Sequence, residues 1–136
     1  MDLPKIQIQY LKTIYRITVE GGRDAKLQDL AKEMEVKEPS ASDILKKLQD
    51  KGLITKVSWG RYTLTKKGVA ITEAIIHNHR VLENFLAETL GLDPDMACRE
   101  ADRIDSAISN ELARKICEKL GRPEQCIHGR CIKHFD

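Results

Sequence analysis

The chain has 136 residues, of which 41% are apolar and 32% charged, and its formal net charge is +2 at pH 7. This length and composition suit one compact domain, or two small units that share a core. The absence of any run of about 18 apolar residues, and of a basic start with an apolar centre at the N-terminus, argues against a membrane-spanning or secreted protein and favours a cytoplasmic one.

The chain contains four cysteines, all in its C-terminal half. In a reducing cytoplasm, cysteines are more often free thiols or metal ligands than members of structural disulfides. The sequence therefore favours thiols or thiolate ligands for Cys98, Cys117, Cys126 and Cys131.

Charge is distributed unevenly along the chain. Residues 46–67 contain seven bases and one acid, a net charge of +6, whereas residues 69–111 contain nine acids and three bases, a net charge of −6. A run of like charge is often a solvated face, but two opposed blocks indicate different partners. The basic block suits a polyanion, and the acidic block suits cations or another protein chain.

Helical periodicity dominates the first fifty residues. Apolar residues recur at helical intervals from Ile6 to Ile17 and the pattern stops at Gly21, which predicts a helix over residues 5–20. A shorter pattern predicts a second helix over residues 27–34.

A third helix and a hairpin follow. The third helix is predicted for VKEPSASDILKKLQDKG, with Pro39 near its start and Gly52 at its end. The next stretch, LITKVSWGRYTLT, alternates apolar and polar residues, which predicts a two-stranded hairpin with its turn at residues 58–61. Three helices followed by a basic hairpin form a winged helix-turn-helix, a DNA-binding unit that we expect over residues 1–68.

The predicted third helix carries short polar side chains near its N-terminus, which can reach base edges, and lysines further along, which suit phosphates. Arg61 lies at the predicted hairpin tip, where a wing contacts DNA. Ser40 could instead cap the helix, and the lysines could serve solubility alone. The candidate DNA contacts are Lys26, Pro39, Ser40, Ser42, Asp43, Lys46, Lys47 and Arg61.

Residues 69–136 are predicted to form a helical domain with a Cys/His tail, so the expected fold class is mainly α with a small β-hairpin. One helix should reach Gly91, the next should end near Ile108, and the last should start at Ser109 and end at Gly121. These helices have little room for a core of their own, so we expect them to pack on the first helix and on a second copy of the chain. The residues expected to be buried in the last helix are Leu112, Ile116 and Leu120.

Side chains that can bind metals share faces in this acidic half. His79 and Glu83 are four residues apart on one predicted helix, and Cys98, Asp102 and Asp105 follow helical spacing on the next. Each alone could be an ordinary core or surface residue. Together, imidazole, thiolate and carboxylate suit zinc or ferrous iron better than magnesium or calcium.

Nearly the whole chain resembles the iron- and manganese-dependent repressors of the diphtheria toxin repressor and manganese transport regulator type, in the short form without an SH3-like domain. The resemblance rests on QYLKTIYRI, LAKEMEVKEPSASDILKKLQDKGLI, YTLTKKGVAI, HRVLENFLAETLGLD, EADRIDSAIS and CIHGRCI. It implies a winged-helix DNA-binding domain, then a helical domain for dimerisation and metal binding. It also implies repression of metal-homeostasis genes when a divalent ion (zinc, iron or manganese) is bound.

The family's ancillary metal site uses two histidines and a glutamate, and the matching positions here are His79, Glu83 and Cys98, with a thiolate in place of one imidazole. The family's primary site is altered more strongly. Its matching positions here are Gln9, Asp102, Asp105 and Ser106, and Lys12 stands where manganese regulators have a carboxylate.

The tail offers replacement ligands. Many family members have a cysteine-proline-histidine-glycine stretch, of which CIHG retains three positions. Cys126, His128 and Cys131 could fold back onto Cys98 and His79 and complete a sulfur-rich tetrahedral zinc site. On this hypothesis Cys131→Ala weakens metal binding.

Two other roles for the cysteines remain open. The four thiols could hold an iron–sulfur cluster, or Cys126 and Cys131 could form a reversible disulfide in a redox-responsive regulator. Against the cluster, Cys117 follows the core pattern of the last helix, where it would be a small apolar filler.

Regulated DNA binding is the function that the sequence favours, with a double-stranded operator and a second copy of the chain as partners and no small-molecule substrate. Ion binding would tie the helices and the tail together and set the spacing of the recognition helices for half-sites about one helical turn apart. A metal-binding or interaction module without regulated DNA binding is an alternative. Enzymatic activity is not expected, because no nucleophile motif or phosphate loop accompanies His79 and Glu83.

Overall fold

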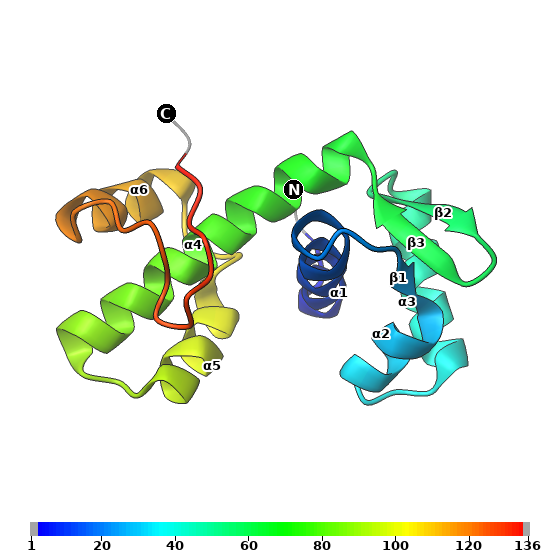
Figure 1. Cartoon of the computed structure of the whole chain (residues 1–136), viewed down its shortest axis with the longest axis horizontal. Coiled ribbons are helices and arrows are strands. Elements are labelled where there is room, and N and C mark those ends of the chain that lie inside the picture. The colour runs from blue at the N-terminus through cyan, green and yellow to red at the C-terminus, as the bar shows by residue number, and fades with distance from the viewer. Residues whose placement is uncertain (1–2, 135–136) are drawn as a thin grey trace. The chain divides into compact units, whose positions relative to one another are not determined.

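The computed structural model describes residues 3–134 (Figure 1). Residues 1–2 and 135–136, at the outer ends of the two predicted domains, lie outside the described part. The chain divides into two compact units, residues 1–72 and residues 73–136. Within residues 3–134, no helix combines the length and the apolar character that crossing a membrane would require.

The first unit begins with the three predicted helices. They are α1 (Lys5–Tyr15), α2 (Leu27–Glu33) and α3 (Glu38–Asp50), and a π-helical segment, η1 (Arg16–Glu20), continues α1. The predicted helix over residues 5–20 thus changes its hydrogen-bonding pattern after Tyr15, where the Thr18 hydroxyl donates to the Ile14 carbonyl at 2.7 Å. The fully buried side chains of the three helices include Tyr10, Leu11, Ile14, Leu30, Leu45 and Leu48.

The predicted hairpin is confirmed, and it gains a third strand. Strands β2 (Ile54–Ser58) and β3 (Arg61–Leu64) pair antiparallel, and β1 (Ala25–Lys26) pairs with the other edge of β3, in the order β1-β3-β2. A two-residue strand is too short to show alternation in the sequence. Its effect is to hold the start of α2 beside the hairpin, since the Leu27 amide donates to the Gly60 carbonyl at 2.8 Å.

A close backbone contact marks the start of α4 (Lys66–Leu90) in the first unit. The Thr65 amide donates to the Leu53 carbonyl at 3.1 Å, and Gly68 packs against the same carbonyl. A β-carbon at Gly68 would lie 2.0 Å from the Leu53 oxygen, which is shorter than any real contact. A glycine is therefore required where the long helix leaves the hairpin.

The second unit contains the rest of α4 together with α5 (Pro94–Ile104) and α6 (Asn110–Lys119). Helix α5 ends four residues earlier than predicted. The Ile108 amide donates to the Ile104 carbonyl in a turn, and Ser109 then caps α6 by accepting from the Leu112 amide at 3.1 Å. The capping serine starts a new helix axis, so the apolar Ile108 cannot extend the previous helix.

The buried face of α6 differs from the prediction. Leu112 was expected to be buried and is 51% exposed, whereas Ala113 and Cys117 are the buried residues of this helix. Ile116 is half-buried, as is Leu120 just after the helix. At about 100° per residue, Leu112 lies about a quarter turn away from the centre of that face, beyond its edge.

The second unit has buried clusters of its own, although the sequence predicted little room for a core there, and its packing on a second copy stays a prediction. One buried cluster combines α4, α6 and the C-terminal segment through Val81, Cys117, Cys126 and Ile132. A second cluster joins α4 to α5 through Leu82, Leu86, Ala97 and Ala101. Small residues on α5 let the two helices approach closely, which positions the polar side chains between them.

The contact at Gly68 leads to a stability prediction. Gly68→Ala should lower the free energy of unfolding by roughly 1–3 kcal/mol, because the added methyl group must displace the Leu53 backbone. Lys67→Ala, at the exposed neighbouring position, should change it by less than about 0.5 kcal/mol. Urea denaturation measures both, and equal effects of the two substitutions would show that the contact imposes no constraint.

Candidate functional site

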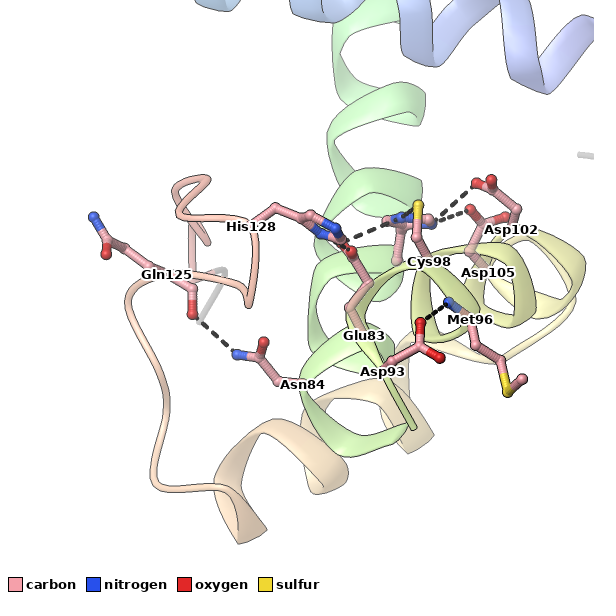
Figure 2. Close-up of polar contacts among 10 residues, drawn as sticks. Glu83, Asn84, Asp93, Met96, Cys98, Asp102, Asp105, Gln125 and His128 are labelled. Atoms are coloured by element: carbon pink, nitrogen blue, oxygen red, sulfur yellow. Dashed lines mark hydrogen bonds and ion pairs between the residues drawn. The ribbon is translucent and has the colours of Figure 1, made fainter. Parts of the chain in front are cut away.

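The C-terminal segment forms a tight turn that is docked on α4. The Gly129 amide donates to the Cys126 carbonyl and the Cys126 amide donates to the Arg130 carbonyl, both at 2.8 Å, while Gln125 pairs with Cys131. Gly129 has φ +78°, a left-handed conformation that favours glycine. The CIHG stretch is therefore a β-turn that places His128 at its tip. Asn84 on α4 holds the turn by donating to the Gln125 carbonyl at 3.0 Å (Figure 2).

His79 is the centre of the candidate metal site, because its two ring nitrogens face different groups. Nε2 lies 3.3 Å from Glu83 Oε1 and 3.7 Å from Cys98 Sγ. Nδ1 lies 3.0 Å from Asp105 Oδ2 and 3.3 Å from Asp102 Oδ1. His79 is 8% exposed, and Glu83 and Asp105 are each 1% exposed, whereas Cys98 and Asp102 are half-buried, so the arrangement is buried at its centre and partly open to solvent at these two residues.

The spacing of His79, Glu83 and Cys98 fits a tetrahedral ion. With bonds of about 2.0–2.1 Å to nitrogen or oxygen and about 2.3 Å to sulfur, tetrahedral angles separate a nitrogen from an oxygen by about 3.3 Å and from a sulfur by about 3.5 Å. The observed separations are 3.3 Å and 3.7 Å. If His79 binds the ion through Nε2, its Nδ1 keeps a proton and can donate it to a carboxylate. A carboxylate is the usual outer-shell partner of a metal-binding histidine. Asp105 occupies that place.

The second oxygen of Glu83 connects the tail to this centre. Glu83 Oε2 lies 2.6 Å from His128 Nδ1 (Figure 2). Glu83, Cys126 and His128 form a further group of possible ligands. Burial, the largest single influence, raises the pKa of Glu83, but its contacts with His79 and His128 outweigh burial and the net pKa shift is downward. Glu83 is thus a buried carboxylate with an imidazole on each side.

The predicted ligands do not all come together. His79 and Glu83 group with Cys98, and His79 also groups with Asp102 and Asp105. Cys131 is exposed and belongs to no such group within residues 3–134, although its carbonyl accepts a hydrogen bond from Arg80. Of the positions that match the family's primary site, Gln9 is half-buried and Lys12 buried in the first unit, whereas Ser106 is exposed in the second.

The four cysteines are free thiols, and two of them, Cys117 and Cys126, belong to the same buried cluster. Among residues 3–134, no group of possible ligands contains two of them. Cys117, predicted to be a core filler, is buried as expected, but its sulfur also lies 3.6 Å from Nδ1 of His134. This sulfur, His134 and His77 form a fourth group, which the sequence analysis missed because residues so far apart in sequence make no recognisable motif.

The candidate DNA-binding residues lie at the surface of the first unit. Most of those predicted on α3 are exposed, and Ser42 is half-buried. Ser40 does not cap the helix, because the cap position is Lys37 and no side-chain hydrogen bond is made there. The hydroxyl of Ser40 is therefore not committed to that role. The exposed residues of this set are Pro39, Ser40, Asp43, Lys46 and Lys47.

A hollow lies beside the hairpin tip, between β1, α2 and α3. It brings together two predicted contacts, Lys26 and Arg61, which are far apart in sequence. Trp59, which also lines this hollow, was not among the predicted DNA contacts. This side chain is 89% exposed, and the Lys56 ammonium lies 4.3 Å from its ring centroid. The residues lining the hollow are Lys26, Leu27, Gln28, Glu38, Trp59, Gly60 and Arg61.

The two parts of the chain match two domain descriptions that belong to one protein family. Residues 4–58 match the N-terminal DNA-binding domain of the iron-dependent repressors. Residues 65–134 match the metal-binding and dimerisation domain of the same proteins.

Individual relatives agree with these matches. The chain is 33% identical over 107 residues to an uncharacterised HTH-type transcriptional regulator of Methanocaldococcus jannaschii, covering 79% of this chain and 86% of the relative. It is 28% identical to the diphtheria toxin repressor of Corynebacterium diphtheriae, covering 99% of this chain but 59% of the relative. The structure of the manganese regulator SloR superposes with a TM-score of 0.84 at 30% identity, covering 94% of this chain and 59% of that one.

These relatives are transcriptional regulators, and the chain spans little more than half the length of the last two. Both halves of the chain match the family, and the second half holds clustered side chains suited to a divalent transition metal. The chain belongs to the iron-dependent repressor family, whose members are metal-dependent DNA-binding transcriptional repressors.

Proposed function

We propose that this chain is a metal-responsive repressor that binds an operator as a homodimer, and that His79, Glu83 and Cys98 hold its regulatory ion. The observation that carries this proposal is the arrangement at the buried Nε2 of His79, where an oxygen and a sulfur lie at tetrahedral ligand spacing. The ligands come from α4 and α5, so an ion held there cross-links the two helices.

The donor set favours zinc or ferrous iron. Imidazole and thiolate prefer borderline ions, whereas manganese prefers oxygen donors. When bound, the ion supplies two positive charges, which the Glu83 carboxylate and the Cys98 thiolate balance. Asp105 accepts from Nδ1–H of His79 and so holds the ring with Nε2 toward the other two ligands. Asp102, at 3.3 Å from the same nitrogen, supports this orientation.

The tail takes part through Glu83. One carboxylate oxygen of Glu83 would bind the ion, and the other contacts His128. Glu83 would therefore couple ion binding to the docking of the C-terminal turn. The turn itself is held on α4 by Asn84. Loss of the ion would return a proton to the Cys98 thiol and remove the cross-link between α4 and α5, which would favour separation of α4, α5 and the tail.

Helix α4 connects the proposed ion site to the DNA-binding unit. It starts in the first unit, directly after the hairpin, and continues into the second unit, where it carries His79 and Glu83. In a homodimer, the arrangement of the two copies sets the distance between their recognition helices, and a palindromic operator accepts one distance. The exposed apolar side chains of the second unit, available to a second copy, are Leu90, Met96, Ile104 and Leu112.

DNA reading is proposed for α3 and the wing. Ser40, Ser42 and Asp43 would approach base edges from the first turns of α3, while Lys46 and Lys47 would contact phosphates. Lys26 and Arg61, gathered at the hollow beside the hairpin tip, would add phosphate or minor-groove contacts. Such a protein would work in the cytoplasm, without catalysing a reaction or binding a small-molecule substrate.

The thiol-based alternatives have less support. An iron–sulfur cluster on Cys98, Cys117, Cys126 and Cys131 requires all four sulfurs to face one space, whereas Cys117 and Cys126 are buried and Cys131 is exposed. A redox pair of Cys126 and Cys131 would join a buried thiol to an exposed one across the β-turn. A metal-binding module without DNA binding would leave the exposed basic and polar face of α3 without a role.

Substitution of single cysteines tests the ion site. Cys98→Ser should weaken zinc binding and remove zinc-dependent retardation of an operator selected from a random duplex library, because it removes the sulfur nearest Nε2 of His79. Cys131→Ser, which alters an exposed sulfur outside the ligand groups, should leave both properties unchanged. Calorimetry and mobility-shift assays with zinc or chelator measure them. Operator affinity of the native chain that is unchanged by chelator would refute regulation by a metal ion.

Salt dependence tests the phosphate contacts. For Lys46→Ala and Lys47→Ala, the plot of log affinity against log salt should be less steep by about two units each, since each substitution would remove one phosphate contact from each copy in the homodimer. Lys115→Ala, an exposed lysine on α6, should leave the slope unchanged. A slope unaffected by the α3 substitutions would place DNA on another surface.

The wing has an intrinsic reporter, because Trp59 is the one tryptophan in the chain and is 89% exposed. Operator binding should change its fluorescence intensity and shift its emission, as the ring leaves water. Arg61→Ala should weaken operator binding several-fold and reduce the amplitude of that change. An unchanged emission spectrum at saturating operator would contradict a role for the wing.

A further inference from the structure

We propose that His77, Cys117 and His134 form a second metal-binding site in the second unit, suited to zinc or a similar borderline ion. The three residues come from α4, α6 and the C-terminal segment, and one possible ligand atom from each lies within 4.8 Å of the other two. None of them belongs to the site at His79.

The geometry of the sulfur and one imidazole matches shared coordination. Cys117 Sγ lies 3.6 Å from His134 Nδ1, and tetrahedral coordination of one zinc ion separates a sulfur from a nitrogen by about 3.5 Å. The rings of His77 and His134 are edge-on to each other, with centroids 6.3 Å apart and an interplanar angle of 78°. Rings in this arrangement are not stacked, so each can direct a nitrogen to a common point.

The surroundings of His134 give an independent indication. Its Nε2 is buried and has no hydrogen-bonding partner within residues 3–134, and its Nδ1 faces the Cys117 thiol. A histidine held in a core for structural reasons normally donates or accepts at both nitrogens. Here the ring is directed at a buried sulfur instead, in a cluster whose other members are Val81, Cys126 and Ile132.

Ion uptake at this group releases one proton, because a thiol must lose its proton to bind a metal, and that proton passes to solvent. Two nitrogens and one sulfur, without a carboxylate, favour zinc over magnesium, calcium or manganese. Water can fill the fourth position.

The two sites can be filled independently. His77 and His79 are two residues apart on α4, so at about 100° per residue they project from nearly opposite sides of the helix. An ion at the first site joins α4 to α5, whereas an ion at the second joins α4 to α6 and to the C-terminal segment. The second ion therefore acts as a cross-link for the tail, and its presence does not depend on DNA binding.

Cobalt(II) titration of the metal-free protein tests the proposal, because cobalt thiolates have a charge-transfer absorption that counts sulfur-ligated ions. We expect two such ions per chain. Cys98→Ser should remove one and His134→Gln the other, so that the double variant shows neither. Lys133→Gln, at the exposed neighbouring position, should retain both.

A second measurement guards against an effect on folding, since Cys117 is in the core and His134 is only half-buried. In the Cys98→Ser background, zinc should raise the unfolding temperature, and adding either His134→Gln or His77→Gln should abolish that rise while circular dichroism stays native. The proposal would be overturned if His134→Gln still bound two sulfur-ligated cobalt ions per chain. It would also be overturned if the native chain bound only one such ion and Cys98→Ser removed it. Neither result bears on metal control of DNA binding.

Discussion

The candidate metal site depends on the position of one imidazole, that of the buried His79, between two helices. Its Nδ1 faces Asp102 on α5 and Asp105 at the end of that helix, and its Nε2 faces Glu83 on α4 and Cys98 on α5. A ring held from one side by buried Asp105 is preorganised for a ligand on the other side, and the small residues Ala97 and Ala101 allow the helices to approach closely enough for this. The contact between α4 and α5 therefore serves both helix packing and metal binding.

Most of the fold could be predicted because periodicity and capping residues act locally. The helices, the hairpin and its turn follow from spacing, glycines and prolines, and residues such as Ser109 mark their ends. The failures have physical reasons. The strand β1 is defined by its partner β3 and is too short for a pattern of its own. Leu112 is apolar at helical spacing but lies beyond the edge of the face that Ala113 and Cys117 bury.

The candidate site could be predicted less completely, because ligand clusters are made by tertiary contacts. The i,i+4 pair of His79 and Glu83 and the spacing on α5 are local, and the side chains so identified do come together. Which tail cysteine faces inward depends on the β-turn, which buries Cys126 and exposes Cys131. The group around Cys117 joins three segments that are distant in sequence, so no spacing rule could reveal it.

The central claim is that an ion is bound at Nε2 of His79, with Glu83 and Cys98 as its other protein ligands. Anomalous diffraction from crystals grown with zinc, measured on both sides of the zinc absorption edge, tests it most directly. The account predicts a peak within about 2.3 Å of Nε2 and of the Cys98 sulfur, with Nδ1 hydrogen-bonded to Asp105. A peak at Nδ1 among the aspartates, with the thiol turned away, would contradict it.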